Sequence, residues 1–149
     1  MKVVIDTNIL INAASDESSY AFRIIKEVIE GRVEAYATHQ TMSENRQILR
    51  KLVRDREYRE LLEEYFRKLN VTKIFKPVNV VADLEDNKLF ESVVASGAEY
   101  LISEDKEVLE VGEYHNCQVI SPQDFWAKYQ NQADDGSAWS DWSKMLMGG

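Results

Sequence analysis

Two carboxylates stand where apolar runs of the sequence end. Asp6 directly follows the β-branched run Val3–Ile5, and Asp105 comes three positions after the apolar run at 100–102. Such runs predict buried strands, and ligand crevices in parallel sheets open at the carboxyl ends of the strands. We therefore expect Asp6 and Asp105 to lie at one edge of a sheet.

Two further acids interrupt the apolar stripes of predicted helices. Glu44 precedes Ile48 by four residues and Leu52 by eight, and Asp86 precedes Leu89 by three. A carboxylate that faces a protein core is unfavourable unless it is paired or binds a metal. Each of the four acids also has a simpler explanation, as a turn residue, a first-turn helix acid, an N-cap or a surface acid. A cation shared at one edge of the sheet explains all four positions together.

The available ligand types indicate which metal this would be. Carboxylate oxygens suit Mg²⁺ or Mn²⁺ rather than zinc or copper, and Mg²⁺ held by acids and water is typical of phosphate chemistry. The one cysteine, Cys117, excludes a multi-cysteine zinc site, and two histidines, His39 and His115, cannot form a histidine-rich one. We expect Cys117 to pack in the interior and both histidines to be surface or capping residues.

Strands and helices alternate along the rest of the sequence. Strands are predicted at 3–5, 34–37, 73–75, 100–102 and 119–120. Helices are predicted at 21–30, from 38 through 53, at 58–69, from 83 or 86 to 97, and from 122 onward, whereas residues 7–12 are predicted to open a polar region. This alternation predicts an α/β fold of three layers, α/β/α, with a mainly parallel central sheet.

Composition and charge narrow the class of protein. With 149 residues, 44% hydrophobic and 30% charged, the chain is neither disordered nor fibrous. No apolar run approaches the roughly 18 residues of a membrane span, and Asp6 comes too early for a signal peptide, so we expect a cytoplasmic protein without a membrane partner. The net charge of −8 argues against a protein that coats nucleic acid but allows an enzyme that holds cations in an acidic pocket.

The C-terminal end differs from the rest in composition. We expect a domain at 1–130, followed at 131–149 by a polar linker and a tail that contains Trp139 and Trp142 together with three apolar residues, Met145, Leu146 and Met147. Exposed apolar patches of this kind usually mark an interface. The tail is predicted to dock on its own domain or on a second chain, and the protein is predicted to form a homodimer.

The ordered set of motifs resembles the PIN domain nucleases, especially the VapC-type toxins. The motifs are Val4–Asn8, Ser43–Glu44, Asp83–Lys88, Leu101–Lys106 and, near the end, Val119–Phe125. The resemblance covers residue 1 to about residue 129 and leaves out the tail. It implies a Mg²⁺- or Mn²⁺-dependent ribonuclease that pairs with itself and with a small antitoxin protein.

The same resemblance assigns roles to particular residues. It implies an acidic quartet that binds the metal, namely Asp6, Glu44, Asp86 and Asp105. Asn8 would support Asp6 by hydrogen bonding, and Thr7 or Ser103 would orient a carboxylate or water. Leu84 stands where the family often has proline, which leaves open whether Asp83 or Asp86 is the ligand. We favour Asp86, because it is in register with the apolar helix that follows.

An RNA substrate would also need local positive charge. Basic residues cluster on one predicted helix and its end, at Arg46, Arg50, Lys51, Arg54 and Arg56, and two more lie beside the acids, Lys88 and Lys106. These side chains are either a solvated helix face or a basic rim that binds RNA around an acidic pocket.

Two other functions compete with the nuclease. A PIN-like domain without turnover would act as an interaction module that docks a partner through its surface helices or its tail. A receiver or haloacid-type phosphatase domain would carry a phosphorylated Asp6, although Asn8 stands where such a phosphatase would have a second aspartate.

Overall fold

The computed structural model describes residues 1–73 and 76–132. Within them a six-stranded sheet has the strand order β3-β2-β1-β4-β6-β5. The strands are β1 (Lys2–Ile5), β2 (Glu34–Thr38), β3 (Asn70–Thr72), β4 (Tyr100–Ile102), β5 (Glu113–Tyr114) and β6 (Cys117–Ile120). All pairs are parallel except β5 with β6. The predicted mainly parallel sheet is confirmed, and the carboxyl ends of β1, β2 and β4 meet at one edge.

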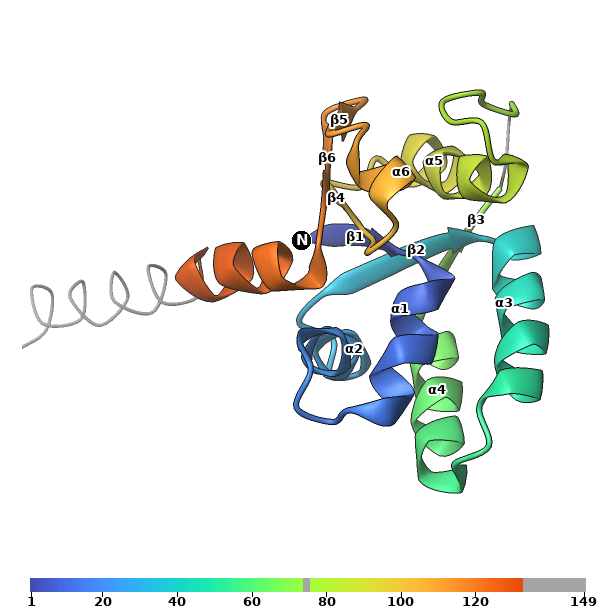
Figure 1. Ribbon diagram of the computed structural model, residues 1–149, viewed down its shortest axis with the longest axis vertical. Helices are drawn as coiled ribbons and strands as arrows, with labels where there is room; N and C mark the ends of the chain where they lie inside the picture. The colour runs from blue at the N-terminus through green and yellow to red at the C-terminus, as the bar shows by residue number, and fades with distance from the viewer. Residues whose placement is uncertain (74–75, 133–149) are drawn as a thin grey trace, which may run out of the picture.

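Helices cover both faces of this sheet (Figure 1). They are α1 (Thr7–Asn12), the 3-10 turn η1 (Ala13–Ser15), α2 (Tyr20–Ile29), α3 (His39–Leu52), α4 (Arg56–Lys68), α5 (Leu84–Ser96), α6 (Lys106–Leu109), and a helix that begins at residue 122 and is described as far as residue 132. In the view of Figure 1, α5 and α6 lie above the sheet and α1, α2 and α4 lie below it. The predicted three-layer α/β/α architecture is therefore confirmed.

The alternation of side chains along β1 divides the core into two parts. Val3 and Ile5 belong to the core beneath α1, α2 and α4, whereas Val4 belongs to the core beneath α5 and α6. Successive side chains of a strand point to opposite faces, so a central strand covered on both sides must be apolar throughout. This requirement is why the short run at the start of the sequence could be recognised as a strand.

The structure departs from the sequence prediction at two segments, one in its type of secondary structure and one in its position. The polar region after β1 is helix α1, whose Ile9 and Leu10 are fully buried and whose N-cap is Asp6. Six residues are too few to show a helical period, so the two adjacent apolar residues were the only signal of this helix in the sequence. Of the weak strand predicted at 73–75, residue 73 is not in a strand, because β3 (Asn70–Thr72) ends one residue earlier. Residues 74 and 75 lie outside the described part of the chain.

The apolar stripe of α4 packs inside its own domain. Tyr58, Leu62, Tyr65 and Phe66 are buried in the core beneath β1 and β2. The tyrosine at position 58 donates a hydrogen bond to the backbone carbonyl of Leu10. This stripe is thus satisfied within one chain, and it gives no reason for a second copy.

The histidines and the cysteine lie where the sequence predicted. His39 and His115 are exposed, and Cys117 is fully buried. The final helix continues to residue 132, so the first two residues of the predicted linker are helical, and the remainder of the predicted tail lies outside the described residues. Across the described ranges, no helix is long and apolar enough to span a membrane.

Candidate active site

Asp6 is a buried carboxylate at the carboxyl end of β1. It caps α1, and its Oδ1 accepts a hydrogen bond from the Asn8 amide at 3.3 Å. The Ser103 hydroxyl, at the end of β4, donates to Asp6 Oδ2 at 2.8 Å. Only 6% of Asp6 is exposed, and this burial raises the pKa of its carboxyl group against the opposing effect of the two hydrogen bonds. The side chain is thus held firmly in a place where its charge is unfavourable.

Asp105 lies at the same edge of the sheet. It caps α6, where its carboxylate accepts hydrogen bonds from the amides of Glu107 at 2.9 Å and Val108 at 3.3 Å. Its own amide donates to Ser103 Oγ at 3.0 Å. Ser103 therefore links the backbone of Asp105 to the carboxylate of Asp6, and the ends of β1 and β4 are coupled through one hydroxyl.

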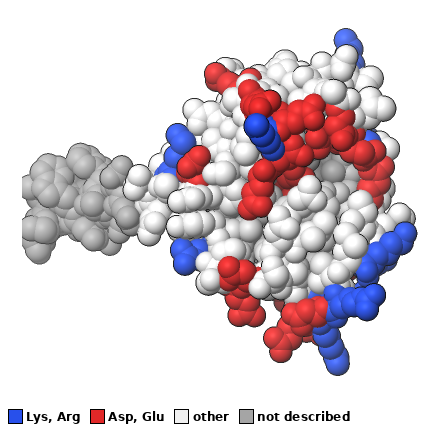
Figure 2. Space-filling view, viewed as in Figure 1, with Lys and Arg blue, Asp and Glu red and all other residues white. Residues whose placement is uncertain are grey.

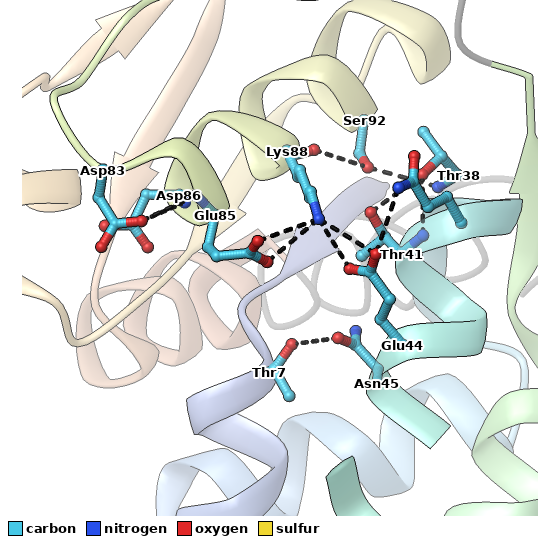
Figure 3. Close-up of polar contacts among 11 residues, drawn as sticks. Thr7, Thr38, Thr41, Glu44, Asn45, Asp83, Glu85, Asp86, Lys88 and Ser92 are labelled. Atoms are coloured by element: carbon cyan, nitrogen blue, oxygen red, sulfur yellow. Dashed lines mark hydrogen bonds and ion pairs between the residues drawn. The ribbon is translucent and has the colours of Figure 1, made fainter. Parts of the chain in front are cut away.

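Asp86, in the first turn of α5, faces this pair. Burial raises the pKa of its carboxyl group to about 6, with further contributions from the charges of Asp105, Asp83 and Asp6. Asp83 is turned toward the helix instead, since it caps α5 by accepting from the amides of Glu85 at 2.8 Å and Asp86 at 3.3 Å (Figure 3). The geometry favours Asp86 over Asp83 as the acid that faces Asp6 and Asp105.

An open pocket of about 300 Å³ lies beside these acids. Its walls come from α1, α3 and α5 and include Asp6, Glu44 and Asp86. Acidic side chains gather in a band around a hollow on this face of the molecule (Figure 2). The residues that line the pocket therefore carry an excess of negative charge, which favours a cation.

Glu44 reaches the pocket for a reason different from the predicted one. The buried residues of α3 are Thr41, Asn45 and Leu49, whereas Ile48 is 42% exposed. The predicted buried stripe through Ile48 and Leu52 is therefore wrong. Both residues share a face of α3 with Glu44 and line the pocket with it, one position away from the face that packs on the core.

Lys88 binds Glu44 across the pocket. Its Nζ lies 3.0 and 3.1 Å from the two carboxylate oxygens of Glu44, and 3.1 and 3.2 Å from those of Glu85. The hydrogen bond to Glu44 is the main reason that the pKa of Lys88 is raised. The predicted RNA contact of Lys88 thus has an internal partner that connects α5 to α3 (Figure 3).

The sequence model of the PIN domain family matches residues 2–107 of the chain, which is more than half of it. The chain belongs to the PIN domain family. This membership removes the reason to interpret Asp6 as a phosphorylated residue of a receiver or phosphatase. No curated protein matches the sequence.

A solved structure supports the fold of this PIN domain. One chain of the crystal structure of VapBC2 from Rickettsia felis, bound to a DNA fragment from their promoter, is similar with a TM-score of 0.55. The match covers 81% of this chain and 98% of that chain, with 10% sequence identity. At this identity the likeness shows the fold alone.

The predicted supporting residues of the PIN domain have mixed contacts. Thr7 donates to Asn45 Oδ1 at 2.5 Å rather than to a carboxylate, and Asn8 contacts Asp6 through its backbone amide rather than its side chain. Sequence reasoning missed Asn45, although a polar residue four positions from both Thr41 and Leu49 is a recognisable signal on a buried helix face.

Most basic residues of the predicted RNA-binding cluster have acidic partners. Arg46 pairs with Glu63 at 2.6 Å, and Arg50 lies 4.0 Å from the same carboxylate. Arg56 pairs with Glu60 at 3.4 Å. Three other basic residues of the cluster are exposed, namely Lys51, Arg54 and Lys106. The RNA-binding role of the cluster stays a prediction.

The PIN domain acids fit a hard divalent cation by their chemistry. All of them offer carboxylate oxygens, and Mg²⁺ is commonly held by one or two carboxylates with several waters. Within residues 1–73 and 76–132, however, no group of three or more acidic, histidine or cysteine side chains is arranged to hold an ion. The expectation that all four predicted acids reach one ion is therefore not met, and Glu44 is bound to Lys88 instead.

Asp86→Asn is expected to stabilise the metal-free protein at pH 8 by about 1 kcal/mol, after allowance for solvent screening of a half-exposed group. The folded-state pKa of Asp86 is about 6, above the ordinary value of 3.8, so the folded state binds more protons between these values. Stability of the wild type therefore falls as pH rises from 4 through 6, whereas the variant lacks this loss.

The measurement is urea unfolding with EDTA at pH 8 and at pH 4. The difference between Asp86→Asn and wild type should vanish at pH 4. The control is Asp55→Asn, because Asp55 is exposed and its side chain makes no capping hydrogen bond. An equal difference at both pH values would contradict the repulsion assigned to Asp86.

Proposed function

We propose that this PIN domain is a divalent-metal-dependent endoribonuclease, which hydrolyses phosphodiester bonds in RNA. The observation that carries the proposal is that Asp6 and Asp105 follow β1 and β4 at one edge of the sheet, and that Asp86 of α5 lines the same pocket as Asp6. Burial and mutual repulsion raise the pKa of Asp86 to about 6 and also raise that of Asp6. A fold that keeps ionisable acids in this arrangement gains stability when a cation neutralises them.

The residues at the pocket have different proposed roles. Asp6, Asp86 and Asp105 would hold Mg²⁺ or Mn²⁺, and Ser103 keeps the Asp6 carboxylate in place through its 2.8 Å hydrogen bond. When bound, such an ion polarises a phosphoryl oxygen and lowers the pKa of a water ligand. Glu44 belongs to the opposite wall of the pocket, with Ile48 beside it.

The biological setting is proposed from resemblance and fold. The VapC-type motifs and the likeness in fold to a chain of VapBC2 support a toxin that is paired with a small antitoxin protein. We also propose a homodimer and a cytoplasmic location. The exposed residues Lys51, Arg54 and Lys106 would contribute the positive charge that an RNA backbone needs.

The test is cleavage of end-labelled single-stranded RNA of mixed sequence by the purified full chain. We expect cleavage with Mn²⁺ or Mg²⁺, loss of cleavage with EDTA, and recovery when excess Mn²⁺ is restored. DNA of the same sequence serves as the substrate control. Cleavage that persists in EDTA would refute metal dependence, and intact RNA under every condition would refute the nuclease.

A catalytically inactive interaction module is the second candidate. It is favoured by one observation, namely that Lys88 already neutralises Glu44, one of the four predicted acids. On this alternative, Mn²⁺ should neither raise the melting temperature nor support RNA cleavage. A rise of several degrees with Mn²⁺, together with cleavage, would decide for the enzyme.

A further inference from the structure

The pocket already contains one positive charge, the ammonium group of Lys88. The Lys88 ammonium contacts both carboxylate oxygens of Glu44 and both of Glu85, at 3.0–3.2 Å. Only 23% of the Lys88 side chain is exposed, and it lines the pocket together with Asp6 and Asp86. These contacts tie α3 to α5 across 44 positions of the sequence.

We propose that Lys88 is a positioning residue that occupies the Glu44 side of the pocket in place of a second metal ion. It thereby limits the pocket to one divalent ion, on the side of Asp6 and Asp86. This inference rests on the proposed function, because it concerns the same metal site.

The position of the ammonium determines which acids a metal ion can reach. A divalent ion bound to Glu44 would sit about 2.0–2.6 Å from the oxygens that Lys88 already contacts at 3.0–3.1 Å. Two cations on the same carboxylate would then lie only a few ångströms apart and would repel each other strongly. Glu44 is therefore unavailable to a metal ion while Lys88 stays in place.

The two sides of the pocket differ because of the geometry of α5. Lys88 lies two residues after Asp86, so the two side chains point to different sides of the helix. Figure 3 shows Lys88 directed toward α3, with Asp86 beside Asp83 on the other side. Asp86 lines the same pocket as Asp6, and Ser103 links the Asp6 carboxylate to the backbone of Asp105. The excess negative charge is consequently concentrated on the side away from Lys88.

The number of Mn²⁺ ions bound by the full chain tests this arrangement. Isothermal titration calorimetry, with electron paramagnetic resonance of free Mn²⁺ as a second measure, should give one ion for the wild type. Lys88→Met removes the ammonium and should raise the number to two, whereas Lys88→Arg should keep it at one. The matched control is Lys26→Met, because Lys26 is an exposed lysine in the last turn of α2, which contributes no residue to the pocket, and one ion is expected.

A second measurement avoids dependence on the folding of Lys88→Met. In the wild-type background, Glu44→Gln should change Mn²⁺ affinity less than about threefold, and Asp86→Asn should lower it more than about tenfold. Two ions in the wild type, one ion in folded Lys88→Met, or equal losses in the last two variants would each overturn the role of Lys88. Failure of the wild type to bind any Mn²⁺ would overturn both this inference and the proposed function. The other three outcomes would overturn this inference alone, so the two failures are distinguishable.

Discussion

Asp6→Asn is expected to reduce metal-dependent RNA cleavage by at least about a hundredfold, since loss of a residue that merely supports a metal ligand already costs 10- to 100-fold. Asparagine keeps the size of the side chain and can still cap α1, but it removes the charge that a metal ion would bind. The rate of cleavage of the labelled RNA under single-turnover conditions measures this effect.

The same substitution separates loss of function from loss of fold. Burial raises the pKa of Asp6, so its ionised form destabilises the folded state near neutral pH. Asp6→Asn should therefore unfold at the same or a higher urea concentration than wild type in EDTA, and it should lose the stabilisation by Mn²⁺. Asp55→Asn should behave as wild type in both assays. An Asp6→Asn variant that unfolds at a clearly lower urea concentration than wild type in EDTA would instead assign Asp6 a structural role.

Asn87→Ala is expected to destabilise the protein by about 3 kcal/mol, because two backbone amides would each lose a hydrogen-bond acceptor. The buried Asn87 Oδ1 accepts from the amides of Val80 at 2.8 Å and Val81 at 2.9 Å. Its Nδ2 donates to the carbonyl of Val81 at 2.9 Å. One side chain on α5 thus holds the segment that leads into this helix.

Urea unfolding of Asn87→Ala in EDTA measures the loss. Leu84→Ala is the control, because Leu84 is 79% exposed on the same helix, and a change within about 0.5 kcal/mol is expected. An Asn87→Ala variant as stable as Leu84→Ala would show that water satisfies the two amides.

The sequence by itself determined the sheet and the acids at its edge. A central strand covered on both faces must be apolar along its whole length, so the runs that precede Asp6 and Asp105 were visible without a structure. An acid that directly follows such a run must lie at the carboxyl end of the strand. For the same reason the three layers could be predicted, because alternating strands and helices leave few other ways to cover a parallel sheet.

Short or locally ambiguous elements were beyond sequence reasoning. Helix α1 has six residues, fewer than two turns, so its buried pair did not form a period. Helix α3 has two faces with the same spacing, one through Thr41 and Leu49 and the other through Ile48. Local periodicity cannot choose between them, and the face with the polar residues is the one that packs inward.

Only the tertiary structure decided what Glu44 and Lys88 do. Each residue looked like an isolated functional group, one a metal ligand and the other an RNA contact. They are 44 positions apart, and their contact depends on how α3 and α5 are set on the sheet. Sequence patterns report the neighbours of a residue along its own element, whereas an ion pair depends on the distance between two elements. Which charges of the pocket wall are paired is therefore decided by the packing of α3 and α5 on the sheet.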